Sequence, residues 1–191
     1  MGELDKRKLN GHKSAVIWLT GLPSAGKSTI ASAFGKELLQ SGIHSIILDG
    51  DQLRKGLNSD LGFSPADRAE NVRRVGEVAR FLMHNNIMVI VAVVSPCEAE
   101  RQKVRGFFEK DRFVEVFVDC PVEVCEERDY RGLYAKARRG DIVDFTGVTA
   151  SYEKPRNPEI HLRTDSLDVP KCVCMICDYL VSREIINFCN K

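Results

Sequence analysis

The sequence is short of several features that mark particular classes of protein. No stretch approaches the roughly 18 consecutive apolar residues of a membrane-spanning helix. The polar first residues, 1–13, lack the apolar core of a secretory signal. The 28 basic and 27 acidic residues leave a net charge of +1, which argues against a broad nucleic-acid-binding face. We therefore expect neither a membrane nor a nucleic acid as a partner.

Internal repeats, low-complexity tracts and linkers are also missing from the 191 residues. A chain of this length supports one domain with a sizeable core and is too short for two large ones. Hydrophobic residues make up 43% and charged residues 29%, as in ordinary globular proteins. We predict a single domain over residues 1–191, in which residues 1–13 form an N-terminal extension.

Cysteine is present in an odd number, seven, and several of the thiols fall in apolar runs. This pattern favours buried thiols in a reducing, cytoplasmic environment. The spacing of Cys172, Cys174 and Cys177 could suit a metal ion, but a second pair of ligands is missing and the stretch has an apolar helical pattern. A core-facing helix is the favoured interpretation.

A glycine-rich segment joins an apolar run to a helical pattern near the start of the chain. Residues 15–20 predict a buried strand, residues 27–40 predict a helix, and Gly-x-x-x-x-Gly-Lys-Ser lies between them. Such a loop turns its backbone N–H groups into a cradle for phosphate, and the helix adds its positive end. Lys27 would reach the β- and γ-phosphates, and the hydroxyl of Ser28 would bind Mg²⁺. The predicted nucleoside-triphosphate site comprises Gly21, Leu22, Pro23, Ser24, Ala25, Gly26, Lys27, Ser28 and Thr29.

Apolar runs and helical patterns alternate along the rest of the chain. Further strands are predicted at 44–48, 87–94, 113–118 and 159–162. Further helices are predicted at 52–57, 65–84, 96–110, 122–127 and 169–188, with Ser64 and Ser95 as expected helix caps. The alternation, together with the phosphate-loop motif, predicts a three-layer α/β fold of the P-loop nucleoside-triphosphate hydrolase type. Its parallel five-stranded sheet would carry helices on both faces.

Polar residues follow three of the predicted strands, and ligands bind at the carboxyl ends of strands in open parallel sheets. They are the phosphate loop, the pair Asp49 and Asp51, and Ser95. One carboxylate of the pair could hold Mg²⁺, while the other accepts the proton of an attacking hydroxyl. The alternative for Asp51 is a helix cap. For Ser95 a helix cap is favoured over a phosphoserine intermediate.

Two basic groups complete the set of candidates. Arg68 and Asn71 share one face of a predicted helix, near Arg73 and Arg74, and suit a substrate phosphate or sulfate; a solvated basic face is the alternative. Residues 128–150 are rich in charge and glycine, with one short helix expected near 133–139. Such a segment could close as a mobile lid that excludes water and supplies positive charge. Its candidate cations are Arg128, Arg131, Lys136, Arg138 and Arg139.

Taken together, these motifs resemble the adenylyl-sulfate kinases (APS kinases). The resemblance extends over most of the chain through Leu9–Lys13, Gly21–Thr29, Asp49–Asp51, Gly56–Asn58, Leu61–Ser64, Asp67–Arg68, Glu70–Asn71, Arg73–Arg74, Ser95–Pro96, Ala99–Arg101, Glu115–Asp119, Gly132–Tyr134, Lys136–Arg138, Asp144–Gly147, Tyr152–Glu153 and Pro158–Ile160. It implies transfer of the γ-phosphate of ATP, with Mg²⁺, to the 3′-hydroxyl of adenylyl sulfate. It also implies a homodimer.

The resemblance further implies roles for individual residues. Adenylyl sulfate would be bound by Asp49, Asp51, Arg54, Phe63, Arg68, Asn71, Lys136 and Phe145, with the two phenylalanines stacked on its adenine. Asp51 would assist both Mg²⁺ and the 3′-hydroxyl, and Arg128 would contact ATP. Ser95 corresponds to a phosphoserine that the family assigns.

The chain departs from the family pattern at a few positions and leaves other functions to weigh. Pro23 and Ala25 stand in the phosphate loop, Cys97 replaces a common aromatic residue, and 149–151 replace a frequent Ser-Pro pair. A different small-molecule kinase is one alternative, but two phenylalanines suit a purine better than a sugar. A GTPase-like switch would need an Asn-Lys-x-Asp motif, which the chain lacks. A regulator without catalysis would not need Asp51.

Overall fold

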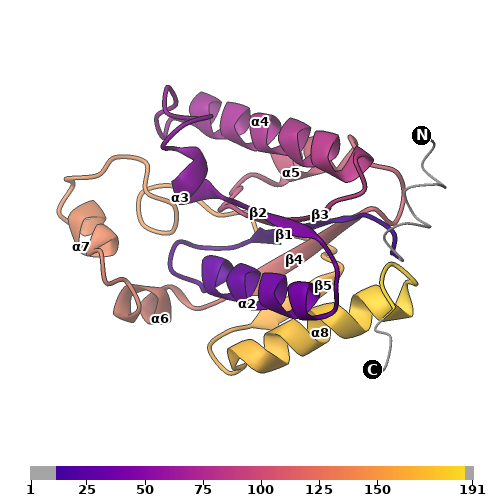
Figure 1. Ribbon diagram of the computed structural model, residues 1–191. Helices are drawn as coiled ribbons and strands as arrows, with labels where there is room; N and C mark the ends of the chain where they lie inside the picture. The colour runs from indigo at the N-terminus through magenta and orange to yellow at the C-terminus, as the bar shows by residue number, and fades with distance from the viewer. Residues whose placement is uncertain (1–11, 188–191) are drawn as a thin grey trace.

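The computed structural model describes residues 12–187, and a parallel five-stranded sheet lies at its centre (Figure 1). The strands are β1 (Val16–Thr20), β2 (Ser45–Asp49), β3 (Met88–Ala92), β4 (Phe113–Asp119) and β5 (Ile160–Arg163), in the order β2-β3-β1-β4-β5. Central β1 pairs with β3 and β4, so that Ile17 lies opposite Ile90 and Val114. Most of the expected extension, 1–11, including Leu9–Gly11 of the family pattern, lies outside the described residues.

Helices cover both faces of the sheet, as predicted. Helices α2 (Lys27–Gln40) and α8 (Val169–Ser182) pack on one face, and α4 (Pro65–His84) and α5 (Glu98–Arg105) pack on the other (Figure 1). Successive side chains of β1 enter opposite cores: Ile17 and Leu19 face α2 and α8, whereas Val16 and Trp18 face α4 and α5. A strand buried on both faces must be apolar throughout, which explains the unbroken run at residues 15–19.

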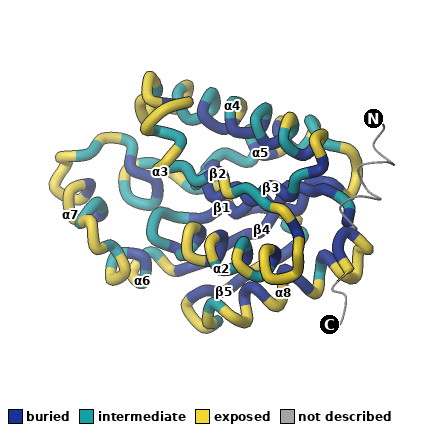
Figure 2. Tube along the Cα trace, in the orientation of Figure 1, coloured by how far each residue is buried: buried dark blue, intermediate teal, exposed yellow. Residues whose placement is uncertain are grey.

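Three short helices lie beyond the carboxyl ends of the strands. They are α3 (Gly50–Leu53), α6 (Val122–Glu127) and α7 (Leu133–Arg138). The strands form the buried centre of the molecule, and exposed residues gather around α7 and at the tips of the loops (Figure 2). Within residues 12–187, no helix combines the length and apolar character that crossing a bilayer requires.

Several predicted boundaries are confirmed because local capping determines them. Helix α2 spans the predicted residues, and α4 begins after Ser64, whose Oγ accepts a hydrogen bond from the backbone N–H of Asp67 at 3.2 Å. The core-facing interpretation of α8 is also confirmed for Cys172 and Cys177, which are buried, while Cys174 is exposed.

Other boundaries are wrong. Helix α3 ends at Leu53 rather than at residue 57, α5 ends at Arg105 rather than 110, and α8 ends at Ser182 rather than 188. The predicted cap at Ser95 is also wrong, because Cys97 occupies the N-cap position of α5. Ser95 instead turns the chain with a positive φ of 40° and is buried.

Candidate active site

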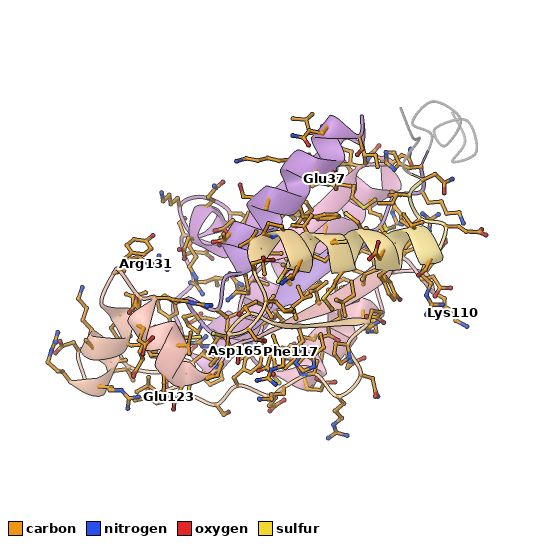
Figure 3. The ribbon with its side chains drawn as sticks, turned by 90° about the horizontal axis from the view of Figure 1, so that it is seen from below. Glu37, Lys110, Phe117, Glu123, Arg131 and Asp165 are labelled. Atoms are coloured by element: carbon orange, nitrogen blue, oxygen red, sulfur yellow. The ribbon has the colours of Figure 1, made fainter. Side chains whose placement is uncertain are left out.

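The candidate residues gather at the carboxyl ends of the strands, around the loop that joins β1 to α2. In Figure 3, Arg131 lies at this end of the molecule and Lys110 at the opposite end. The segments that meet here are residues 21–28, residues 49–51 and the beginning of the 128–150 segment. They come from positions far apart in the sequence.

The loop at 21–28 has the backbone of a phosphate cradle. Gly21 adopts a φ of 152°, and a Cβ at this position would lie 2.3 Å from the carbonyl oxygen of Val118. Gly26 adopts a φ of 102° immediately before α2. No larger residue fits at Gly21, and a side chain at Gly26 would be strained. The loop is therefore built around both glycines of the motif.

Lys27 points into this loop. Its Nζ donates hydrogen bonds to the carbonyl oxygens of Gly21, at 2.9 Å, and Leu22, at 2.7 Å. Burial lowers the pKa of Lys27 from 10.5 to about 8, although the nearby Cys125, Asp49 and Asp51 oppose the shift. A desolvated ammonium next to a nest of N–H groups favours an anionic ligand.

Asp49 connects the phosphate loop to the start of α3. One carboxylate oxygen accepts a hydrogen bond from Ser28 Oγ at 2.6 Å, and the other accepts one from the backbone N–H of Asp51 at 2.9 Å. Asp49 is therefore the cap of α3, and the interpretation of Asp51 as that cap is wrong. The carboxylate of Asp51 is exposed and accepts a hydrogen bond from Arg131 Nη1 at 2.5 Å.

Oxygen atoms supply the ligands that Mg²⁺ would require here. The hydroxyl of Ser28 donates a hydrogen bond to the carboxylate of Asp49, and Asp51 follows two residues after Asp49 in the sequence. Among residues 12–187 no cluster of three or more acidic, histidine or cysteine side chains could enclose a metal ion. This arrangement fits Mg²⁺, which proteins commonly hold through one or two side chains together with substrate phosphates.

A second group of candidates lies between α3 and α4. The guanidinium of Arg54 stands 4.3 Å from the ring centre of Phe63, which is 52% exposed. Arg68 donates from Nε to the carbonyl oxygen of Phe63 at 2.9 Å and from Nη2 to that of Asp144. Burial lowers the pKa of both Arg54 and Arg68. Arg68 thus joins the loop that carries Phe63 to the residue before Phe145.

Phe145 is buried, in contrast to Phe63. Its ring packs edge-on against Tyr134 at 4.9 Å between ring centres. The hydroxyl of Tyr134 donates to the carbonyl oxygen of Pro23 at 3.0 Å. Through these contacts Phe145 is tied to the phosphate loop, and Pro23, a departure from the family pattern, provides the attachment point.

Asn71 is buried on α4 and accepts a hydrogen bond from Asn58 at 3.0 Å. Its neighbours Arg73 and Arg74 are engaged elsewhere, since both pair with Glu70. Arg73 and Arg74, in that order, lower the pKa of Glu70 to about 2 through hydrogen bonds. For Arg73 and Arg74 the solvated-face interpretation therefore fits better than a substrate-binding one.

Cations of the 128–150 segment take several different partners. Arg128 donates to the carbonyl oxygen of Thr164 at 2.8 Å, Arg138 pairs with Glu126, and Arg139 pairs with Asp141. Arg131 pairs with Asp51, and Lys136 is exposed on α7. Arg131 is thus the cation of this segment that contacts Asp51.

Ser95 is enclosed by structural contacts. Its Oγ accepts a hydrogen bond from the indole of Trp18 at 3.0 Å, and its carbonyl oxygen accepts one from buried Arg101 at 2.7 Å. The side chain is 3% exposed. These contacts favour a role in shaping the end of β3 over a role as a nucleophile.

Sequence reasoning missed two residues that support the site. Thr164 follows β5 and donates from Oγ1 to the carbonyl oxygen of Ala25 at 2.9 Å, inside the phosphate loop. The rule that ligands gather at strand ends would have found it, had it been applied to β5. Tyr134 has no comparable signal, because its contact with Pro23 joins residues 111 positions apart.

Comparison with known proteins points to one family. Residues 13–163 match the family described as adenylylsulphate kinase. The adenylyl-sulfate kinase of Staphylococcus haemolyticus is 50% identical over 182 residues, which cover 95% of this chain and 92% of that protein. The probable adenylyl-sulfate kinase of Bacillus subtilis is 46% identical over 182 residues, with the same coverage of 95% and 92%.

Solved structures agree with the sequence relatives. The Mycobacterium tuberculosis APS kinase in complex with AMPPNP and APS is 42% identical and gives a TM-score of 0.84, covering 89% of this chain and 99% of that one. A gluconokinase from Sinorhizobium meliloti gives a TM-score of 0.60 over 91% of this chain and 94% of its own. At 16% identity, that likeness concerns the fold alone.

Proposed function

Because the chain belongs to the adenylyl-sulfate kinase family, we propose that it transfers the γ-phosphate of ATP to the 3′-hydroxyl of adenylyl sulfate. The products are 3′-phosphoadenylyl sulfate and ADP, so the enzyme takes part in sulfate activation. The observation that carries the proposal is the double contact of Asp49. It accepts hydrogen bonds from both Ser28 of the phosphate loop and the backbone N–H of Asp51, and so holds the start of α3, which carries the carboxylate of Asp51, beside the donor site.

The phosphate loop binds the donor. Its backbone N–H groups and the N-terminus of α2 hold the phosphates, and the ammonium of Lys27 leaves the loop carbonyls to contact the β- and γ-phosphates. Arg128 contacts ATP from beside Thr164, which already anchors the carbonyl of Ala25. Mg²⁺, held by Ser28 and Asp51 with the phosphates, would neutralise the charge that develops on the transferred group.

Asp51 acts on the acceptor. Its carboxylate accepts the proton of the 3′-hydroxyl as the oxygen attacks the γ-phosphorus, and the bond to ADP breaks. Arg131 forms an ion pair with that carboxylate in this structure, and the pair has to break before the carboxylate can accept the proton. The γ-phosphate would offer Arg131 a new anionic partner, and there Arg131 would join Lys136 in stabilising the transferring phosphate.

The loop between α3 and α4 selects the acceptor. Arg54, Arg68 and Asn71 bind the anionic sulfate and phosphate, and the exposed ring of Phe63 stacks on adenine. Phe145 supplies the opposite face, and its attachment through Tyr134 to Pro23 sets that face relative to the donor site. A direct transfer follows, without a phosphoserine at Ser95, because that hydroxyl is buried against Trp18.

The test is steady-state turnover with ATP, Mg²⁺ and adenylyl sulfate, with a nucleoside and a sugar as competing acceptors. We expect 3′-phosphoadenylyl sulfate as the product. Turnover with the nucleoside or the sugar, together with none on adenylyl sulfate, would reject the proposal.

The carboxylate role is tested by Asp51→Ala. We expect kcat to fall by about 10²-fold or more, the contribution of a general base. The melting temperature should stay close to that of the native protein, because Asp51 is exposed and Asp49 caps the helix. Asp141→Ala is the matched control, since Asp141 is also an exposed acid paired with an arginine of the same segment. A near-native rate for Asp51→Ala would contradict the catalytic role, and the ion pair with Arg131 would then be the remaining role of Asp51.

We also propose that the enzyme works as a homodimer in the cytoplasm. The family resemblance supports the dimer, and the use of ATP together with free, largely buried thiols supports the compartment. A related APS kinase, from Thiobacillus denitrificans, is described as hexameric, so the assembly varies among relatives. Light scattering on the purified protein distinguishes a dimer from a monomer or hexamer.

A further inference from the structure

Asn58 is a buried amide in an exposed loop. Its side chain is 0% exposed, although Leu57 beside it is 44% exposed and the side chain of Asp60 is 59% exposed. This reverses the usual arrangement, in which the leucine of such a loop turns inward and the asparagine faces water. A buried polar side chain in this setting calls for a specific reason.

The hydrogen bonds of Asn58 are incomplete. Its Nδ2 donates to Oδ1 of Asn71 at 3.0 Å, and its own Oδ1 has no partner among the described residues. Leaving a buried acceptor unpaired destabilises the folded state, and a leucine has the same number of side-chain heavy atoms without that defect. The stability of the fold therefore does not account for an amide at this position.

Fixing the orientation of Asn71 does account for it. An asparagine amide has an acceptor end and a donor end, and the bond from Asn58 commits the acceptor end of Asn71. The donor end, Nδ2, makes no hydrogen bond to another residue within 12–187 and stays available. Asn71 lies one helical turn after Arg68, which contacts the segments that carry both Phe63 and Phe145.

We propose that Asn58 is a positioning residue, which holds the amide of Asn71 with its donor end toward the anionic part of the acceptor nucleotide. The inference rests on the proposed function, because it takes Asn71 to bind that nucleotide. Without Asn58 the amide of Asn71 would rotate freely, and half of its orientations would present an oxygen to an anion. Asn58 thus contributes to acceptor affinity without touching the acceptor.

A purely mechanical role is the competing explanation, and the loop offers a control for it. Arg74 ties the same loop to α4, donating to the carbonyl oxygen of Leu57 at 3.0 Å and to Asp60 at 2.7 Å. Arg74→Ala therefore loosens the loop without touching the amide pair. If anchoring is all that matters, Arg74→Ala and Asn58→Leu will have the same effect.

The experiment measures kcat, KM for each substrate and the melting temperature of the native protein and of Asn58→Leu, Arg74→Ala, Asn71→Ala and the double variant Asn58→Leu/Asn71→Ala. For Asn58→Leu we expect KM for adenylyl sulfate to rise about twofold, because only half of the orientations of the Asn71 amide would then be competent to bind. KM for ATP and kcat should stay near native values. Asn58→Ala, which removes the amide without adding methyl groups, replaces the leucine variant if that one does not fold.

The double variant decides whether Asn58 acts through Asn71. We expect it to resemble Asn71→Ala alone, because a positioning residue has nothing left to position. An unchanged KM for adenylyl sulfate in folded Asn58→Leu, an equal rise in Arg74→Ala, or additive effects in the double variant would each overturn the inference. Failure of the native protein to use adenylyl sulfate would instead overturn the proposed function.

Discussion

Lys27 is a residue whose charge the site itself controls. Burial lowers its pKa to about 8, below the ordinary 10.5, so the free enzyme loses the ammonium as the pH rises through 8. Bound phosphate favours the charged form and raises that pKa again. We therefore expect KM for ATP to be level below pH 8 and to rise above it, by about tenfold one pH unit beyond the pKa.

Proton uptake provides the independent measurement. Calorimetric titration of ATP into the enzyme at pH 8.5, in buffers of different ionisation enthalpy, should show protons taken up on binding. The control is kcat at saturating ATP, which this lysine should leave level over the same range because phosphate keeps it charged. A KM for ATP that does not change between pH 7.5 and 9.5 would contradict the lowered pKa.

Ser95 is the residue for which the family resemblance and the structure disagree. Its hydroxyl accepts a hydrogen bond from Trp18 and is buried, so we expect Ser95→Ala to keep its turnover and to lose stability. The loss should be about 1–3 kcal/mol, the cost of leaving a buried indole N–H unpaired. Chemical denaturation and steady-state rates measure the two effects. A folded Ser95→Ala protein without activity would restore the phosphoserine route.

Single residues were predictable from the sequence where the chemistry is local. The phosphate loop and Lys27 follow from one motif, because its glycines, lysine and helix are consecutive. The bond between Asp51 and Arg131 joins residues 80 positions apart, and no spacing rule reaches that far. The burial of Asn58 was equally unpredictable, since exposed residues flank it in the loop.

At the scale of elements, predicted boundaries are accurate where a capping residue ends the helical pattern. They are wrong where buried apolar residues continue beyond the end of the helix. Ser64 and Pro65 begin α4 where expected. Helix α8 ends at Ser182, yet Ile185 and Ile186 are also buried, so the apolar pattern continues into an irregular segment. In that segment Glu184 adopts a φ of 54°, and the sequence contains no signal that predicts this left-handed turn.

The 128–150 segment shows what periodicity alone leaves out. Its short helix was predicted, and α7 lies where expected. Its attachments were not: the side chain of Asp129 accepts a hydrogen bond from the backbone N–H of Tyr134, whose hydroxyl reaches Pro23. A segment without strong periodicity can thus hold a defined position through a few polar contacts. Its closure over the nucleotides stays a prediction.

At the scale of the whole molecule, the sheet brings the two halves of the site together. Because all five strands are parallel, their carboxyl ends share one edge, and the order β2-β3-β1-β4-β5 places Asp49 at the end of the outer strand β2 and the phosphate loop at the end of central β1. The alternation of strands and helices predicted this edge. The proposed acceptor site adds the loop between α3 and α4 and residues 144–145, which the sequence linked only through the family resemblance.

Magnesium dependence tests this joint site through the stability of the whole protein. We expect ATP at 100 times its Kd, with Mg²⁺, to stabilise the folded state by about 2.7 kcal/mol. For a chain of this length that corresponds to a rise in melting temperature of about 5–10 °C. Removal of Mg²⁺ by EDTA should abolish most of the rise, because in the proposed site Ser28 and Asp51 would meet the phosphates through the metal ion. EDTA without nucleotide should change nothing, since the oxygen ligands at this edge need the phosphates to complete a magnesium site. An ATP-induced rise that survives EDTA would mean that the backbone cradle and Lys27 bind the donor unaided.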